Sequence, residues 1–226
     1  MKRILVVVLV VALAMIGATA AMAAVVGSKH DIRAIAGATG TAGFATGEVC
    51  VYCHTPHSAN TDATVDLLWN KTYITATAGF TPYTSATSSV ASAVSTKSPI
   101  TRLCLSCHDG TFAVYAMGNP PNYGGYVTGN GAGSANIAPG GLIIGNPLLT
   151  SDFSNDHPIG FDYATAVSLN PAGSLAPTLP ATLPLQAGLM ECSTCHNVHD
   201  SGGNAHAFLR IPNTGSALCL TCHISK

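Results

Sequence analysis

The sequence has very little charge. Asp, Glu, Lys and Arg make up 8% of its 226 residues, against about 25% in typical soluble domains. It has no cluster of basic residues, so nothing in the chain favours binding to nucleic acid. Three stretches contain no charged residue at all, namely 72–96, 110–151 and 163–190. Large subunit contacts would explain these stretches, because interface cores are depleted in charge, and ordinary loops of small residues would explain them as well.

Long apolar runs are also absent, except at the start of the chain. Two basic residues precede an apolar run over 4–20, and the small residues of Ala21-Met22-Ala23 follow it. This pattern predicts a secretory signal peptide over 1–23. A retained membrane anchor is the alternative, for which the run is short. No cysteine precedes Cys50, which excludes a lipoprotein cysteine at the cleavage site.

The predicted mature protein spans residues 24–226. It contains no further run that is apolar enough to cross a bilayer, so we expect no membrane span after cleavage. We expect an exported protein, in the periplasm or at the cell exterior. Loss of Lys2 and Arg3 leaves seven basic and ten acidic residues, which gives a formal charge of about −3.

No cysteine stands alone. The eight cysteines form four pairs, each with two residues between the cysteines and a histidine directly after the second. With nine histidines in the chain, chance would place one after all four pairs about once in several hundred thousand such chains. The four CXXCH motifs, numbered 1 to 4 in chain order, are Cys50-Val51-Tyr52-Cys53-His54, Cys104-Leu105-Ser106-Cys107-His108, Cys192-Ser193-Thr194-Cys195-His196 and Cys219-Leu220-Thr221-Cys222-His223.

Disulfide bonds and structural zinc also use paired cysteines. Neither requires a histidine after every pair, and structural zinc is uncommon outside the cytoplasm. Covalent haem explains each residue of the motif. Two thiols three residues apart form thioethers with the vinyl groups on one edge of the porphyrin, and the next residue supplies the proximal iron ligand. The motifs therefore predict four haem c groups, with His54, His108, His196 and His223 as proximal ligands.

Five histidines remain for at most four distal positions. Two of them, His57 and His199, each follow a proximal histidine by three residues. If these turns are helical, residues three apart share one face, and the two histidines of each segment cannot bind opposite sides of one iron. We therefore expect His57 and His199 each to bind a different haem from the one tethered beside it. This arrangement requires the haems to be close neighbours, and close haems exchange electrons quickly.

The other three histidines lie away from the motifs. We predict that His157 is a long-range distal ligand, with an ordinary loop histidine as the alternative. His30, near the mature N-terminus, is predicted to bind iron within the chain or in a neighbouring subunit. His206 is predicted to be the spare, on a surface loop. Met117 and Met190 are alternative iron ligands, although we expect core or loop positions for both.

A CXXCHXXH motif followed by a plain CXXCH motif occurs twice. This loose repeat predicts two haem-pair modules, about 48–118 and 156–226, joined by a Gly- and Pro-rich segment. We expect a multihaem cytochrome c fold, mostly coil with short helices at the motifs and few short strands, organised around four closely packed haems. The stretch 72–98 is predicted to be strand or coil, and 119–147 and 164–188 to be irregular. Because such a chain buries little core by itself, we expect the apo-protein to be largely unfolded.

Several short sequences resemble those of a known family. They are Cys53-His54-Thr55-Pro56-His57, Leu68-Trp69-Asn70, Phe80-Thr81-Pro82-Tyr83, 103–110, Asp156-His157-Pro158, 192–199 and 218–223. In combination, and over essentially the whole mature chain, they resemble the doubled-CXXCH tetrahaem c-type cytochromes of metal-reducing bacteria. The resemblance implies bis-histidine haems in a closely packed chain and respiratory electron transfer across the periplasm or outside the cell. It also marks Trp69 and Asn70 as family features.

Some proteins of the family it resembles polymerise into extracellular filaments, in which an N-terminal histidine can bind a haem of the next subunit. His30 matches that histidine by position. The sharpest functional hypothesis is therefore a filament subunit, and a monomeric periplasmic shuttle is the alternative. Shuttles usually dock through charged patches, and this chain is poor in charge. Redox proteins or extracellular electron acceptors would be the partners.

An enzyme such as a nitrite or hydroxylamine reductase is the third hypothesis. Its chemistry needs an iron with an open coordination position. Five candidate distal ligands for four haems leave no evident vacancy, and the chain has no CXXCK motif. We therefore expect an electron carrier with no catalytic residues.

Overall fold

The computed structural model describes residues 25–34, 49–61, 67–72, 79–86, 88, 90, 99–119, 136–170, 173–200 and 208–224. All eight cysteines lie within these ranges, as do all the histidines except His206. The predicted signal peptide, 1–23, lies outside the described residues, so the structure does not bear on it. Within the described ranges, no helix has the length and apolar character needed to cross a membrane.

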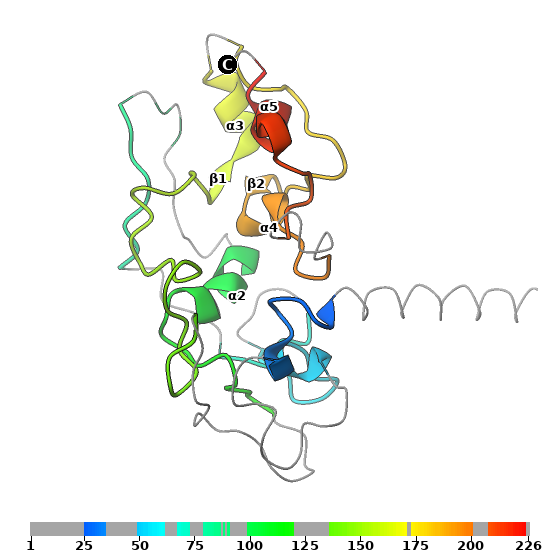
Figure 1. Ribbon diagram of the computed structural model, residues 1–226. Helices are drawn as coiled ribbons and strands as arrows, with labels where there is room; N and C mark the ends of the chain where they lie inside the picture. The colour runs from blue at the N-terminus through cyan, green and yellow to red at the C-terminus, as the bar shows by residue number, and fades with distance from the viewer. Residues whose placement is uncertain are drawn as a thin grey trace, which may run out of the picture.

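The chain is mostly loop, with short helices at intervals (Figure 1). Two strands of two residues each form an antiparallel pair, in which Phe161 lies opposite Met190 and Asp162 opposite Leu189. In Figure 1 this pair lies near α3 and α5 at one end, and the N-terminal elements, in blue and cyan, lie at the other. In chain order the elements are η1 (Ile32–Ala34), η2 (Cys50–Tyr52), α2 (Pro99–His108), β1 (Phe161–Asp162), α3 (Tyr163–Ser168), β2 (Leu189–Met190), α4 (Cys192–Cys195), η4 (Thr214–Ser216) and α5 (Ala217–Cys222).

The predicted character of the fold, mostly coil with short helices and few strands, is confirmed. The prediction of irregular structure over 164–188 is wrong for its first five residues, which belong to α3. The carboxylate of Asp162 caps this helix by accepting the N–H of Thr165 at 2.7 Å, and such a cap is a strong helix-start signal. The four prolines of the stretch all come after α3 has ended, so they leave it undisturbed.

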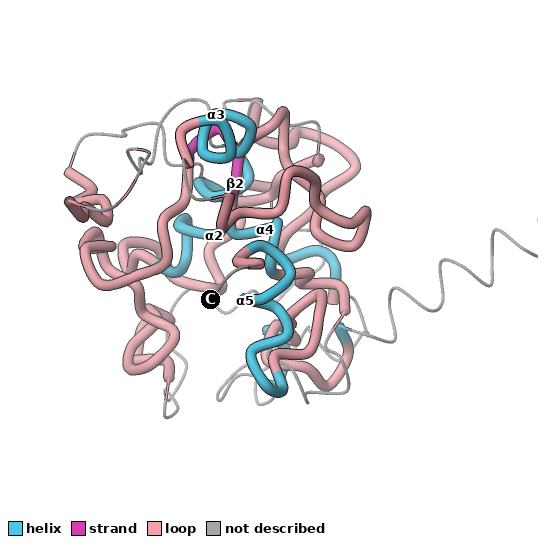
Figure 2. The backbone as a smooth tube through the Cα atoms, turned by 90° about the horizontal axis from the view of Figure 1, so that it is seen from above, coloured by secondary structure: helices cyan, strands magenta, loops and turns pink. Residues whose placement is uncertain are grey.

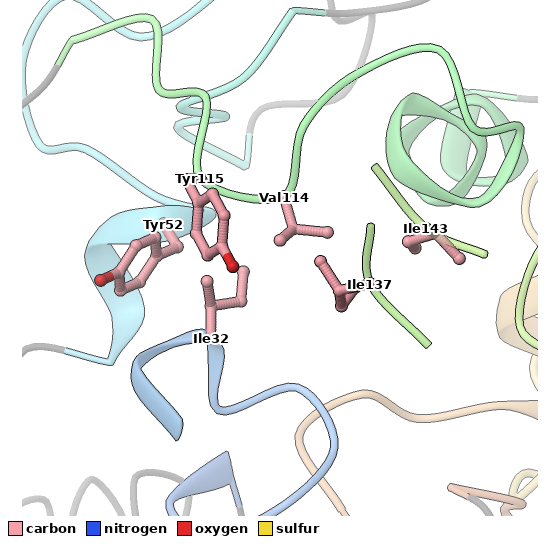
Figure 3. Packing of buried hydrophobic residues seen from close by; sticks show 6 residues of the cluster. All are labelled: Ile32, Tyr52, Val114, Tyr115, Ile137 and Ile143. Carbon is pink, nitrogen blue, oxygen red and sulfur yellow. The ribbon is translucent and has the colours of Figure 1, made fainter. Parts of the chain in front are cut away.

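The larger of the two buried apolar clusters among the described residues joins four separate parts of the chain (Figure 3). We call it the core cluster, and its members are Ile32, Tyr52, Val114, Tyr115, Ile137 and Ile143. Cys53 of motif 1 and Cys107 of motif 2 pack against it. A second cluster is built on Leu105 and Phe153. The motifs are thus part of the packing.

Helices α2 and α4 lie side by side in both views (Figures 1 and 2). Helix α2 begins with Pro99, which suits a first helical position because its missing N–H would be unpaired there in any case. Glu191 caps the same helix from far along the chain, because its Oε2 accepts the N–H of Thr101 at 2.7 Å. In return, Thr101 Oγ1 accepts the N–H of Cys192 at 3.4 Å. Thr101 and Glu191 are buried, so this polar junction fixes motif 3 against the helix that carries motif 2.

Candidate functional site

Each CXXCH motif occupies one helical turn that ends at its histidine. Motif 1 lies on η2 and motif 3 on α4, whereas motifs 2 and 4 form the ends of α2 and α5. In motifs 1, 3 and 4 the histidine N–H donates to the carbonyl of the first cysteine, at 2.9, 3.0 and 2.9 Å. Residues three and four apart on a helix share one face. Both thiols therefore stand beside each other, close to the histidine that follows them.

All eight cysteines are free thiols in the structure. Among the residues it describes, no group of three or more His, Cys, Asp and Glu side chains is arranged to hold a metal ion. Structural zinc would need four such ligands. An iron in a porphyrin needs only two protein ligands, one on each side, so the histidines are best considered in pairs.

His54 of motif 1 and His199 form the first pair. Their ring centroids are 6.1 Å apart and their planes are 31° from parallel. His54 Nδ1 lies 2.6 Å from the carbonyl oxygen of Leu67, to which a protonated Nδ1 donates. That tautomer leaves Nε2 unprotonated and able to bind a metal. The Trp69 ring meets the His54 ring edge-on and limits its orientation.

His108 of motif 2 and His30 form the second pair, with ring centroids 6.2 Å apart. His108 Nδ1 lies 2.8 Å from the carbonyl oxygen of Pro147. His30 packs edge-on against Phe208 at 4.5 Å, and its Nδ1 is buried without a hydrogen-bond partner. Burial first, and then the nearby His108, His196 and His199, lower the pKa of His30 to about 4. His30 is therefore neutral at neutral pH, the form that binds iron.

His223 of motif 4 and His157 form the third pair, with ring centroids 6.4 Å apart. His157 Nδ1 lies 2.9 Å from the carbonyl oxygen of Pro158. An isolated bridge between Leu175 and His223, together with the bond from the Ala176 N–H to the Cys222 carbonyl, fixes the end of motif 4. Two hydrogen-bonded segments thus hold this pair of rings.

The distances between ring centroids in the three histidine pairs have a common explanation. Two imidazoles bound at about 2.0 Å on opposite sides of one metal have ring centroids about 6 Å apart. The observed values of 6.1, 6.2 and 6.4 Å all match this spacing. Each pair also joins one CXXCH histidine to one histidine from elsewhere in the chain. The residues present therefore fit haem iron.

His57 behaves differently from these histidines. Its side chain is exposed, and its ring contacts no other histidine ring in the described part of the chain. Its carbonyl oxygen, by contrast, is held by Thr55 Oγ1 at 2.8 Å and Asn119 Nδ2 at 2.7 Å. The loop is therefore ordered while the imidazole points outward.

Neighbouring motifs contact one another in chain order. Cys53 of motif 1 and Cys107 of motif 2 share the core cluster. The thiols of Cys104 in motif 2 and Cys192 in motif 3 hydrogen-bond, which raises the pKa of Cys104 and lowers that of Cys192. Motifs 1 and 2, and motifs 2 and 3, are therefore adjacent at their cysteines.

Motifs 3 and 4 are adjacent in the same way. Burial raises the pKa of Cys195 to about 11, and the next largest cause is the nearby thiol of Cys222. Burial and Cys222 likewise raise the pKa of Tyr163 to about 12, which places α3 beside motif 4. The four pairs of thiols thus form a continuous series through the protein.

Asn70 is a site residue whose role the sequence did not reveal. Its Nδ2 donates to the Val51 carbonyl inside motif 1 at 2.7 Å, and its Oδ1 accepts the Asn119 N–H at 2.8 Å. Its own N–H and carbonyl bond to Cys53 and Gly118, each at 2.8 Å. Asn70 is 1% exposed. It therefore connects motif 1 to the segment that follows motif 2, using every polar group it has.

Comparison with known proteins agrees with this site. Residues 184–226, which contain motifs 3 and 4, match the family described as having a doubled CXXCH motif. No curated protein matches the chain. The family match supports a multihaem protein similar to c-type cytochromes, with haem attached through its CXXCH motifs and a role in electron transfer.

Proposed function

We propose that this protein carries four covalently attached haem c groups and passes electrons between the haems of successive motifs. The observation that carries the proposal is the set of three histidine pairs at 6.1–6.4 Å, each of which includes a CXXCH histidine. Haem supplies one-electron redox chemistry. The contacts between successive motifs keep neighbouring groups close, as electron transfer requires.

The role of each residue follows from its position. The cysteines tether the haems, and each CXXCH histidine is the proximal ligand. His199, His30 and His157 are the distal ligands for motifs 1, 2 and 4. Backbone carbonyls hold Nδ1 of three ligands and so direct Nε2 of each toward iron. The tethering residues are Cys50, Cys53, Cys104, Cys107, Cys192, Cys195, Cys219 and Cys222.

The fourth haem, at His196, has two remaining candidates for its distal ligand. His57 is the sequence-based choice and stays a prediction, and His206 is the other. Because the His57 ring is exposed, a second copy of the chain could reach it. Replacing His57 and His206 separately by alanine distinguishes the two candidates, because only loss of the true ligand converts an iron to high spin.

We further propose that the protein is exported and works in the periplasm or at the cell exterior. A filament subunit remains its sharpest form, supported by the low charge and by exposed apolar side chains such as Leu67, Leu68 and Val198 beside the motifs. His30 is largely buried against His108 in the same chain, so His57 becomes the better candidate for a ligand at a subunit interface. A monomeric shuttle is the second candidate.

Electron microscopy of haem-containing material sheared from cells separates these two forms. Filaments of uniform width that contain this protein support a polymeric conductor. Discrete particles, with the haem confined to the periplasm, support a shuttle.

We propose that the protein is an electron carrier and not an enzyme. With five candidate distal histidines, every iron can be six-coordinate, which leaves no position for a substrate. The ferric protein is then expected to be low-spin throughout. A high-spin component in the wild-type spectrum would revive the reductase hypothesis.

Intact-mass spectrometry tests the haem count. The mature chain should carry the mass of four haems, and replacing Cys104 and Cys107 by alanine should remove one of them. A wild-type protein with fewer than four haems would contradict the proposal.

A further inference from the structure

Lys71 is a buried cation that has no anionic partner among the residues that the structure describes. It is 4% exposed. Its Nζ donates to the carbonyl oxygens of Val114 and Ala116, at 2.7 and 3.0 Å. A lysine ammonium has three donors, and no carboxylate in the described part of the chain forms an ion pair with Lys71. Burying a charge in this way costs several kcal/mol unless it is paired, so its retention calls for a functional explanation.

The position of Lys71 gives that explanation. It follows Asn70, which is hydrogen-bonded to motif 1, and its carbonyl accepts Asn60 Nδ2 at 2.9 Å. Its Nζ reaches Val114, a member of the core cluster against which Cys53 and Cys107 pack. The ammonium group is therefore held at the junction of motifs 1 and 2.

Both tethering cysteines at this junction, Cys53 and Cys107, pack against the core cluster, and the carbonyl of its member Val114 accepts the bond from Lys71 Nζ at 2.7 Å. A fixed charge at this place acts on haems attached through these cysteines, because the interior screens it weakly.

We propose that Lys71 is a fixed positive charge that raises the reduction potentials of the haems at motifs 1 and 2 above those at motifs 3 and 4. Reduction adds an electron, so a nearby cation stabilises the reduced form. Electrons entering at motif 4 would then move downhill toward motif 1. This inference rests on the proposed function.

The test is a redox titration of the holo-protein, followed by absorbance and NMR. Lys71→Gln keeps a donor for the two carbonyls but removes the charge. We expect the reduction potentials of two of the four haems to fall by about 59 mV, which is a tenfold change in the equilibrium constant for one-electron reduction. Lys71→Arg keeps the charge and is expected to keep the wild-type potentials. Lys29→Gln is the matched control, because Lys29 is exposed, so solvent and salt screen the loss of its charge.

Haem content is measured first in every variant. A wild-type protein without four haems contradicts the proposed function itself. A wild-type protein with four haems, whose potentials do not change in Lys71→Gln beyond the Lys29→Gln control, contradicts only the inference. If Lys71→Gln loses haem, the potentials of the wild-type haems still test the inference, once NMR has assigned each potential to its motif. NMR assignment of each midpoint to its motif supports the inference if motifs 1 and 2 have the highest potentials, and overturns it otherwise.

Discussion

His54 and His199 face each other with ring centroids 6.1 Å apart, although they belong to motifs 1 and 3. His199 follows His196 by three residues, so under the proposed function the same short segment would supply the proximal ligand of one haem and the distal ligand of another. The haem at motif 1 would then be connected directly to the segment that carries motif 3. Such sharing would bring the haems close together and make the fold depend on them.

Replacing His199 by alanine is expected to leave the iron at motif 1 without its distal ligand. One haem of the four should become high-spin in the ferric protein, as measured by electron paramagnetic resonance and by absorbance. The proximal His54 keeps its hydrogen bond to Leu67, so the haem itself should stay attached. An all-low-spin spectrum in His199→Ala would show that this pairing is incorrect.

The same measurement distinguishes His157 from His206. His157 faces His223 at 6.4 Å, so His157→Ala is expected to give one high-spin haem. His206→Ala is expected to keep the wild-type spectrum, because His206 is the predicted spare. The reverse pattern would exchange the two roles.

Asn70→Ala is expected to destabilise the region around motif 1. It removes two side-chain hydrogen bonds and leaves the partly buried Val51 carbonyl and Asn119 N–H unpaired. Each unsatisfied group costs about 1–3 kcal/mol, so a loss of about 3 kcal/mol is expected in guanidinium unfolding followed by Trp69 fluorescence. Asn155→Ala, at an exposed turn, is the control and should change the stability by less than about 0.5 kcal/mol. Equal losses of stability in the two variants would show that Asn70 has no special structural role.

Glu191 is expected to make stability depend on pH. Burial raises the pKa of its carboxyl above 4.5, and its Oε1 is buried without a partner. A carboxyl whose pKa is raised by folding binds its proton more tightly in the folded state. The contribution of Glu191 to the free energy of unfolding should therefore be fully present below pH 4.5 and be lost as pH rises through the raised pKa. Glu191→Gln should lose this part of the pH dependence, as measured by unfolding at about pH 5 and about pH 8.

The pH dependence of unfolding in Glu191→Gln can also contradict this prediction. An unchanged pH dependence in Glu191→Gln would mean that the carboxyl is ionised to the same extent in the folded and unfolded chain. The cap on the Thr101 N–H would then be a charged one.

The sequence predicts the parts of this protein that depend on neighbouring residues. A CXXCH motif needs only one helical turn, so the short helices and the class of cofactor follow directly from the spacing of the cysteines. Helix α3 was missed because the prolines after it dominate the composition of 164–188, whereas its cap depends on the single residue Asp162.

The parts that depend on long-range packing were not predictable. The prediction that His199 binds a different haem from the one tethered beside it assumed a helical turn from His196 to His199, whereas α4 ends at Cys195 and His196 is extended. Only the folded chain places His199 against His54. The sequence likewise left open whether His30 acts within the chain, where the structure now places it beside His108. Lys71 and Glu191 are single charged residues without any surrounding pattern, and their importance comes from burial beside distant motifs.

An experimental structure of the haem-loaded protein tests the central claim most directly, because it shows which nitrogen atoms bind each iron. We predict four irons, three of which lie between His54 and His199, between His108 and His30, and between His223 and His157. Irons bound by other pairs of these histidines, or a CXXCH motif without haem, would contradict it.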